Sequence, residues 1–174
     1  VSNNYFERLA GSSNRSALAI MDAQATPPLS GYAPVVNASI SRNTFVDVAK
    51  ISFGVGHDTA KGIDVAASNS RFSANLIVSR TSKNPPTAAS SLAGIAFSGN
   101  VQSPQASTVF PSGVESRSVT LQQAASGLWT PTPALPATGA DPALAMTARE
   151  ATGVDWYPKV GEVALSRTST GVDR

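Results

Sequence analysis

Short apolar segments separated by turn-forming residues recur along this chain, and they limit its fold to a β-rich one. The clearest segment is Phe72–Arg80, in which Phe72, Ala74, Leu76 and Val78 alternate with mostly polar residues. A period of two places one set of side chains on the inner face of a β-strand and the other set on its outer face. The alternation therefore predicts a strand with one buried face.

Other segments have the same character. Thr44–Phe53 is rich in β-branched and aromatic residues, and neither of its faces is cleanly polar, which is typical of a strand covered on both sides. Shorter candidates lie at 35–40, 63–67, 92–97, 109–110, 114–121 and 160–166. Many short strands joined by Gly, Pro, Ser and Asn turns predict a mainly β fold, a sandwich or barrel-like domain of short antiparallel strands. No internal repeat of fixed period is visible.

One or two short helices are expected beside the strands. A serine or asparagine cap at residues 13–14 precedes apolar residues 17–21, which favours a short helix there. Asp141 as a cap and Pro142 at the first helical position predict a second helix over 143–151. Residues 119–126 fit either a strand or a helix of two turns.

The chain divides into four predicted parts. Residues 1–34 form an N-terminal arm with a possible short helix, and residues 35–129 form the β-rich core domain. Residues 130–142 are proline-rich and nearly uncharged, which indicates an extended linker or arm. Residues 143–174 form a helix and a strand packed on the core or on a neighbour. No apolar run approaches the roughly 20 residues that cross a bilayer, so no membrane insertion is expected.

Charged residues are sparse, at 14% of the chain, against roughly 25% in an average soluble domain. A surface poor in ionised side chains suits burial against a partner, because little ion desolvation is needed. In composition alone the chain resembles virion proteins. We therefore predict a structural protein of a capsid, decoration or surface array and not an enzyme. Its partners would be copies of itself or other assembly subunits. Its location would be a virion or the extracellular space, with cytoplasmic assembly as an alternative.

Aromatic and proline residues near the linker are the candidate partner contacts. They are Trp129, Pro131, Pro133, Pro136, Trp156 and Tyr157. Aromatic side chains beside extended segments can anchor a protein partner or stack on a sugar. An alternative function is therefore a secreted β-sandwich module that binds carbohydrate or mediates adhesion. Ordinary core packing of the aromatic residues is the competing interpretation.

Catalytic chemistry has one candidate, His57, the only histidine. It lies in a glycine-containing loop next to Asp58, and a histidine oriented by a carboxylate can act as a general base. The less favoured function is therefore a hydrolase that uses His57. The alternative interpretation is a turn in which Asp58 acts as a cap. With no cysteine and a single histidine, the sequence predicts no metal site and no cofactor.

Basic residues exceed acidic ones by only two charges and are scattered along the chain. Without a dense Lys/Arg block, no specific nucleic-acid binding is expected. Arg71, Arg80 and Lys83 flank one predicted strand. They form either a small basic patch or, as we favour, ordinary solvated strand ends.

Overall fold

The computed structural model describes residues 1–2, 4–10, 16–29, 31–80, 87–103, 113–125 and 127–132. These residues form strands and one three-residue 3₁₀-helix, Thr59–Lys61, so the expected mainly β class is confirmed. The strands are β1 (Tyr5–Glu7), β2 (Ser16–Met21), β3 (Ser39–Ser41), β4 (Thr44–Val46), β5 (Lys50–Val55), β6 (Ser70–Ser73), β7 (Leu76–Val78), β8 (Thr87–Ala89), β9 (Ile95–Ser98), β10 (Asn100–Ser103), β11 (Val114–Ser116), β12 (Leu121–Gln123) and β13 (Trp129–Pro131).

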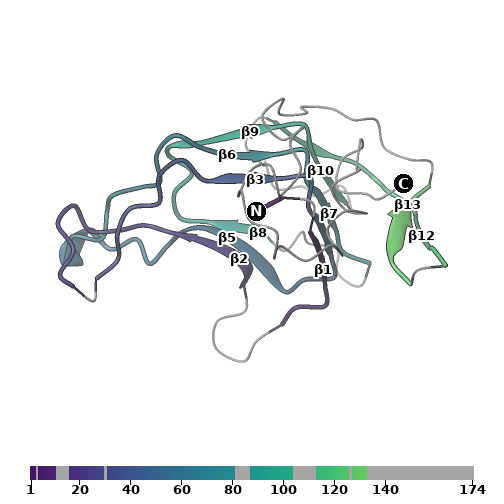
Figure 1. Cartoon of the computed structure of the whole chain (residues 1–174), viewed down its shortest axis with the longest axis horizontal. Coiled ribbons are helices and arrows are strands. Elements are labelled where there is room, and N and C mark those ends of the chain that lie inside the picture. Colours follow the sequence, from purple (N-terminus) through teal and green to yellow (C-terminus); the bar gives the residue numbers. More distant parts are fainter. Residues whose placement is uncertain are drawn as a thin grey trace, which may run out of the picture.

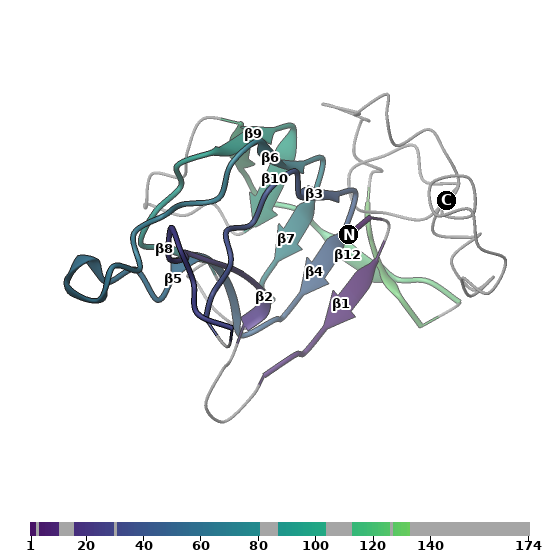
Figure 2. The same ribbon diagram turned by 60° about the vertical axis from the view of Figure 1, so that its left-hand side comes forward.

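Three parallel sheets surround one core (Figure 1). Sheet 1 has the order β1-β4-β7-β10-β11, sheet 2 the order β2-β5-β8, and sheet 3 the order β3-β6-β9. The chain passes from sheet 1 to sheet 2 to sheet 3 and then returns to sheet 1 one strand further along. Each such circuit is called a rung below. Figure 2 shows β1, β4 and β7 side by side in sheet 1. This winding is a parallel β-helix.

The expected antiparallel sandwich or barrel is wrong, because every strand pair in sheets 1, 2 and 3 is parallel. Among the described strands, only β12 and β13 pair antiparallel. Alternation of side chains reports which face of a strand is buried and says nothing about the direction of its neighbour. The predicted strand Phe72–Arg80 is in fact the end of β6, a bend, and β7. Thr44–Phe53 likewise divides between β4 and β5, which belong to different sheets.

The bends between sheets use left-handed backbone at matching positions. At the corner from sheet 3 to sheet 1, φ is 55° at Arg42, 52° at Ala74 and 60° at Gly99. Residues other than glycine adopt this region at a cost of roughly 1–2 kcal/mol, so the surrounding structure must hold Arg42 and Ala74 there. A single left-handed residue turns the chain sharply. A bend of this kind continues the coil without reversing the chain.

A ladder of asparagines fills the same corner. Asn4, Asn43, Asn75 and Asn100 each lie at the start of a sheet 1 strand, and the last three are buried. The Oδ1 atom of Asn75 accepts hydrogen bonds from the backbone N–H and the Nδ2 of Asn43, both at 2.9 Å. Asn100 accepts the same pair of bonds from Asn75 at 3.0 Å, and Asn43 accepts it from Asn4 at 3.0 Å. The ladder therefore satisfies amide groups that the bend would leave unpaired inside the core.

Aromatic rings dominate the interior. Phe45 stacks on Phe6 with ring centroids 4.8 Å apart, and Phe72 lies 6.4 Å from Phe45, 5.4 Å from Phe53 and 5.8 Å from Phe97. Full burial of one such ring contributes roughly 1.5–3 kcal/mol. The rings come from all three sheets and hold successive rungs in register.

The outer face of sheet 1 is also apolar and covered. Leu76, Val78 and Val101 point away from the interior and pack against Val119 and Leu121, which lie before and within β12. β7 and β10 are therefore buried on both faces. For β7 this contradicts the prediction from Phe72–Arg80, in which Leu76 and Val78 face inward and the other face is mostly polar.

The repeat has no constant length, which is why it is not visible in the sequence. The ladder positions 4, 43, 75 and 100 are separated by 39, 32 and 25 residues. Because loops between sheets differ in length, only the strands and corners repeat.

The helix expected after residues 13–14 is absent from the described part of that region, where residues 16–21 form β2. The alternative for 119–126 resolves as the strand β12. The helix over 143–151 and the strand over 160–166 lie outside the described residues, and the four-part domain division stays a prediction.

Candidate functional site

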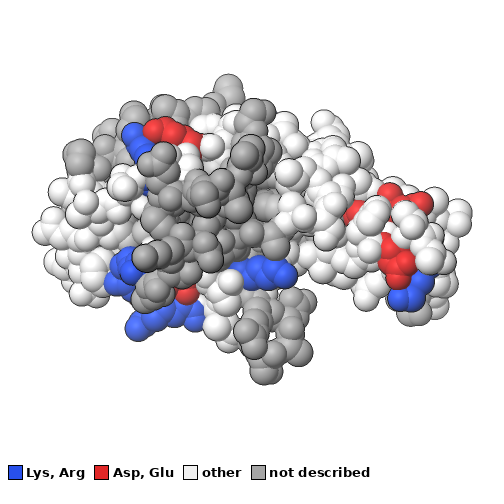
Figure 3. Space-filling model, turned by 180° about the vertical axis from the view of Figure 1, so that it is seen from behind, with Lys and Arg blue, Asp and Glu red and all other residues white. Residues whose placement is uncertain are grey.

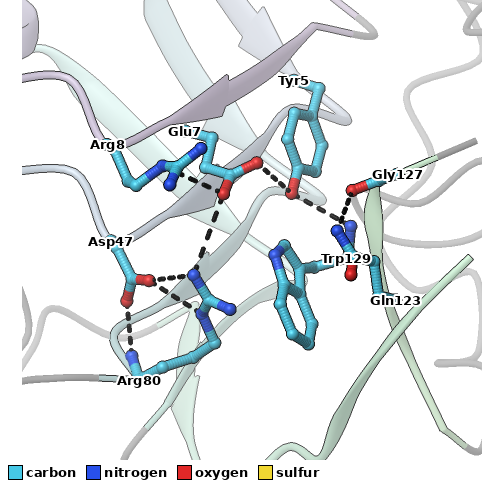
Figure 4. Close-up of polar contacts among 8 residues, drawn as sticks. All are labelled: Tyr5, Glu7, Arg8, Asp47, Arg80, Gln123, Gly127 and Trp129. Atoms are coloured by element: carbon cyan, nitrogen blue, oxygen red, sulfur yellow. Dashed lines mark hydrogen bonds and ion pairs between the residues drawn. The ribbon is translucent and has the colours of Figure 1, made fainter.

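A charged cluster lies at the carboxyl ends of three sheet 1 strands (Figure 4). The guanidinium of Arg80 donates from Nε to Asp47 Oδ2 at 2.7 Å, and its Nη2 lies 2.5 Å from the same oxygen. The backbone N–H of Arg80 donates to Asp47 Oδ1 at 2.6 Å. Oε1 of Glu7 lies 3.8 Å from Nη2 of Arg80 and 3.3 Å from Nε of Arg8. The cluster therefore joins three successive rungs by ion pairs.

The hairpin β12–β13 binds to this cluster. The guanidinium carbon of Arg80 lies 3.9 Å from the ring centre of Trp129, a cation–π contact. The Tyr5 hydroxyl accepts from the Trp129 backbone N–H at 3.1 Å and donates to Glu7 at 3.2 Å. Burial raises the pKa of Tyr5, with Glu7 adding to the rise and the Trp129 N–H opposing it.

Each charged side chain of this cluster lies beside a side chain of opposite charge. Arg80 faces two carboxylates and one indole ring, and the Tyr5 hydroxyl is engaged on both sides. A tyrosine with a raised pKa is a poor base, and a doubly paired arginine has little capacity for a further anion. The cluster therefore holds the hairpin beside β1, as Figure 2 shows, and is poorly suited to bind substrate.

His57 has a carboxylate partner that its sequence neighbours did not indicate. Its Nδ1 lies 2.8 Å from Oδ2 of Asp22, whose side chain is 2% exposed, whereas the His57 side chain is 38% exposed. Asp58 instead caps the 3₁₀-helix and pairs with Lys61 at 2.8 Å, as the turn interpretation expected. Residues 35 positions apart meet because β2 and β5 are neighbours in sheet 2.

Two surface grooves lie among the described residues. The first, called the sheet 3 groove, has a volume of about 560 Å³. It is lined by Asn69, Ser70, Arg71, Gly94, Ile95, Ala96 and Ser98 of β6, β9 and the bends before them. The second, of about 360 Å³, is lined by Gly99, Asn100, Gly113, Val114 and Glu115. The first groove carries a cationic side chain and the second a carboxylate.

The predicted contact residues are only partly described. Trp129 is half-buried against Arg80, and Pro131 is buried at the end of β13. Pro133, Pro136, Trp156 and Tyr157 lie outside the described residues. Three basic residues were expected to be solvated strand ends or, less favoured, a small patch. Of these, Arg80 lies in the charged cluster and Arg71 in the sheet 3 groove, and Lys83 lies outside the described residues.

In the view of Figure 3, the Lys, Arg, Asp and Glu side chains of the described residues form small separate groups among uncharged described residues. The described residues hold no cluster of three His, Cys, Asp or Glu side chains suited to a metal ion. No described helix is long and apolar enough to cross a membrane.

The winding of the chain through three parallel sheets defines the class of this protein as a parallel β-helix. Residues 1–138 match the chondroitinase B family, so the chain belongs to that family. Solved structures of the PL6 family alginate lyase AlyGC and of a mutant of it are similar to this chain, with TM-scores of 0.67 and 0.66 and identities of 33% and 32%. Each comparison covers 75% of this chain and 18% of the solved chain. A comparison with curated protein sequences gives no match.

These findings correct the functional prediction. The family and the structural neighbours are polysaccharide lyases, so the expectations of a virion component and of a protein that is not an enzyme are both wrong. An extracellular location is compatible with such lyases, whereas the virion location has no support. A charged fraction of 14% is therefore compatible with a parallel β-helix enzyme family as well as with an assembly surface.

Proposed function

We propose that the chain is part of a lyase that cleaves an anionic, uronate-containing polysaccharide. The match of residues 1–138 to the chondroitinase B family carries this proposal. The alginate lyases that resemble the chain support the same substrate class, because alginate and chondroitin-type polymers both carry sugar carboxylates. The chain spans less than a fifth of those solved enzymes.

The proposed reaction is a β-elimination. A base removes the proton on the carbon next to the carboxylate, and the electron pair forms a carbon–carbon double bond as the bond to the glycosidic oxygen breaks. The leaving oxygen then takes up a proton. Such a step needs a base, an acid and positive charge or hydrogen bonds at the carboxylate, where negative charge develops. Arginine suits the last role because its planar fork donates two parallel hydrogen bonds.

The test is incubation with alginate, a chondroitin-type polymer and a neutral glucan. The elimination product absorbs ultraviolet light because its new double bond is conjugated with the carboxylate. We expect this absorbance with at least one uronate polymer and none with the glucan. Retention of uronate polymer without absorbance would support the substrate class and place the reacting groups outside these 174 residues. Neither retention nor absorbance would contradict the proposal.

An extracellular location is part of the same proposal, because a large anionic polymer outside the cell is accessible only to a secreted enzyme. Association with copies of itself stays a prediction, and light scattering measures it directly.

A further inference from the structure

We propose that the sheet 3 groove is a binding subsite for one uronate residue of the polysaccharide, with Arg71 binding its carboxylate. This inference rests on the proposed function and adds a place and a contact residue to it. It depends on where Arg71 points, on the charge of the groove and on the shape of its floor.

Arg71 points outward from the coil. Its neighbours in β6, Ser70 and Phe72, are buried, and a strand alternates its faces, so the Arg71 side chain lies on the outer face. In the register of sheet 3, Arg71 lies between Ser39 of β3 and Ala96 of β9. A long cationic side chain therefore stands beside a small one.

The charge of the sheet 3 groove favours an anion. Its described lining contains one guanidinium, the amide of Asn69 and the hydroxyl of Ser98, and no carboxylate. The other groove contains Glu115, which would repel a uronate.

The floor of the groove lies over packed aromatic rings, and the groove leaves room for a sugar. Phe72 and Phe97 alternate with Arg71 and Ala96 along β6 and β9, and their rings lie 5.8 Å apart in the interior. The volume of about 560 Å³ lies within the roughly 300–1,000 Å³ range of small-ligand pockets. Gly94 shapes one end, because a Cβ there would lie 1.7 Å from the carbonyl oxygen of Ala67 in the preceding rung.

The experiment compares Ala96→Glu with Ala96→Gln, two side chains of the same shape that differ in charge. Ala96 is exposed, so neither change disturbs the core. Arg71→Ala tests the cation directly. Lys50→Ala removes the same charge from an exposed position at the start of β5 in sheet 2. Dissociation constants are measured by affinity electrophoresis in gels that contain alginate, with gels that contain a neutral glucan as the reference.

The proposal expects Arg71→Ala and Ala96→Glu to weaken alginate binding about tenfold or more, the effect of one lost charge-assisted contact. Ala96→Gln should weaken it less than Ala96→Glu, because only the glutamate adds a negative charge, and Lys50→Ala should change it less than about twofold. Equal weakening by Arg71→Ala and Lys50→Ala would overturn the subsite, because binding would then depend on net charge alone. Absence of alginate binding in the wild type, together with absence of the elimination product, would instead overturn the proposed function.

Discussion

The asparagine ladder and the sheet 3 groove use polar residues of the same rungs in opposite ways. The ladder lies inside the corner, where Asn43, Asn75 and Asn100 are at most 1% exposed and bond to one another. The groove lies on the outer face, where Arg71 and Ala96 are exposed. Polar groups turned inward must be satisfied by the protein, whereas those turned outward are in contact with solvent and can be reached by a ligand. We therefore attribute a structural role to the asparagine ladder and a binding role to the sheet 3 groove.

The largest effect is expected for Asn75→Ala. The change leaves the backbone N–H of Asn43 without its acceptor and leaves Asn43 Nδ2 with Val1 O alone, at 3.2 Å. It also removes the side-chain bonds from Asn75 to Ile40 and Asn100. Several buried groups lose partners together, so the free energy of unfolding should fall by about 4 kcal/mol. Urea denaturation followed by circular dichroism measures it.

Asn69→Ala is the matched control, because Asn69 is exposed and bonds to the side chain of Asn37. Its cost should be about 1 kcal/mol or less. Equal costs at positions 69 and 75 would show that the ladder has no special role.

The next effect separates a crowded bend from an open one. Gly94 and Gly62 have similar φ values of 71° and 64°, but an added Cβ meets a backbone oxygen at position 94 and nothing within 4 Å at position 62. Gly94→Ala should lower the free energy of unfolding by about 3 kcal/mol and Gly62→Ala by about 1 kcal/mol. Thermal unfolding of both variants gives the difference. Similar losses would mean that the carbonyl oxygen of Ala67 does not closely approach Gly94.

A smaller effect is expected for Ala74→Gly at the ladder corner. Ala74 has a φ of 52°, which glycine adopts without strain, and its side chain is 3% exposed. Relief of strain offsets the loss of a buried methyl group and the entropic cost of glycine, so the free energy of unfolding should change by less than about 0.5 kcal/mol. Ala67→Gly is the control: Ala67 is also buried but is absent from the described positive-φ residues, so this change should destabilise by about 1 kcal/mol or more. Equal losses in the two variants would contradict the assignment of strain to the corner.

The smallest effect on stability is expected for Arg71→Ala. An exposed side chain on the outer face should change the free energy of unfolding by no more than about 0.5 kcal/mol. The same variant should bind alginate about tenfold more weakly, as proposed above. A marked loss of stability would move Arg71 from the binding surface to the structural framework.

The sequence predicted the β class but not the winding. Alternation at Phe72–Val78 placed Phe72 correctly in the interior but was wrong for β7, where Ile77 faces the interior and Leu76 and Val78 point away from it. The bend at Ala74 causes the change of face, and it was not visible because alanine rarely adopts a left-handed backbone. Asn43, Asn75 and Asn100 are a signal that was present and missed. Their unequal spacing hides them from a search for a constant period, and only the register of sheet 1 aligns them.

The candidate site was less predictable. His57 was identified as the only histidine, but its partner Asp22 is 35 residues away, and contacts between rungs are not visible in local sequence. For Arg71 and Arg80 the sequence favoured solvated strand ends over a small basic patch. The fold separates their roles, because Arg80 pairs with Asp47 and Arg71 lines the sheet 3 groove.

The most direct test of the central claim is the migration of the wild-type chain through gels that contain alginate or a neutral glucan. The account predicts retardation by alginate that increases with polymer concentration, decreases with added salt and is absent in the glucan gel. Equal migration in the two gels, with no elimination product from any uronate polymer, would contradict it.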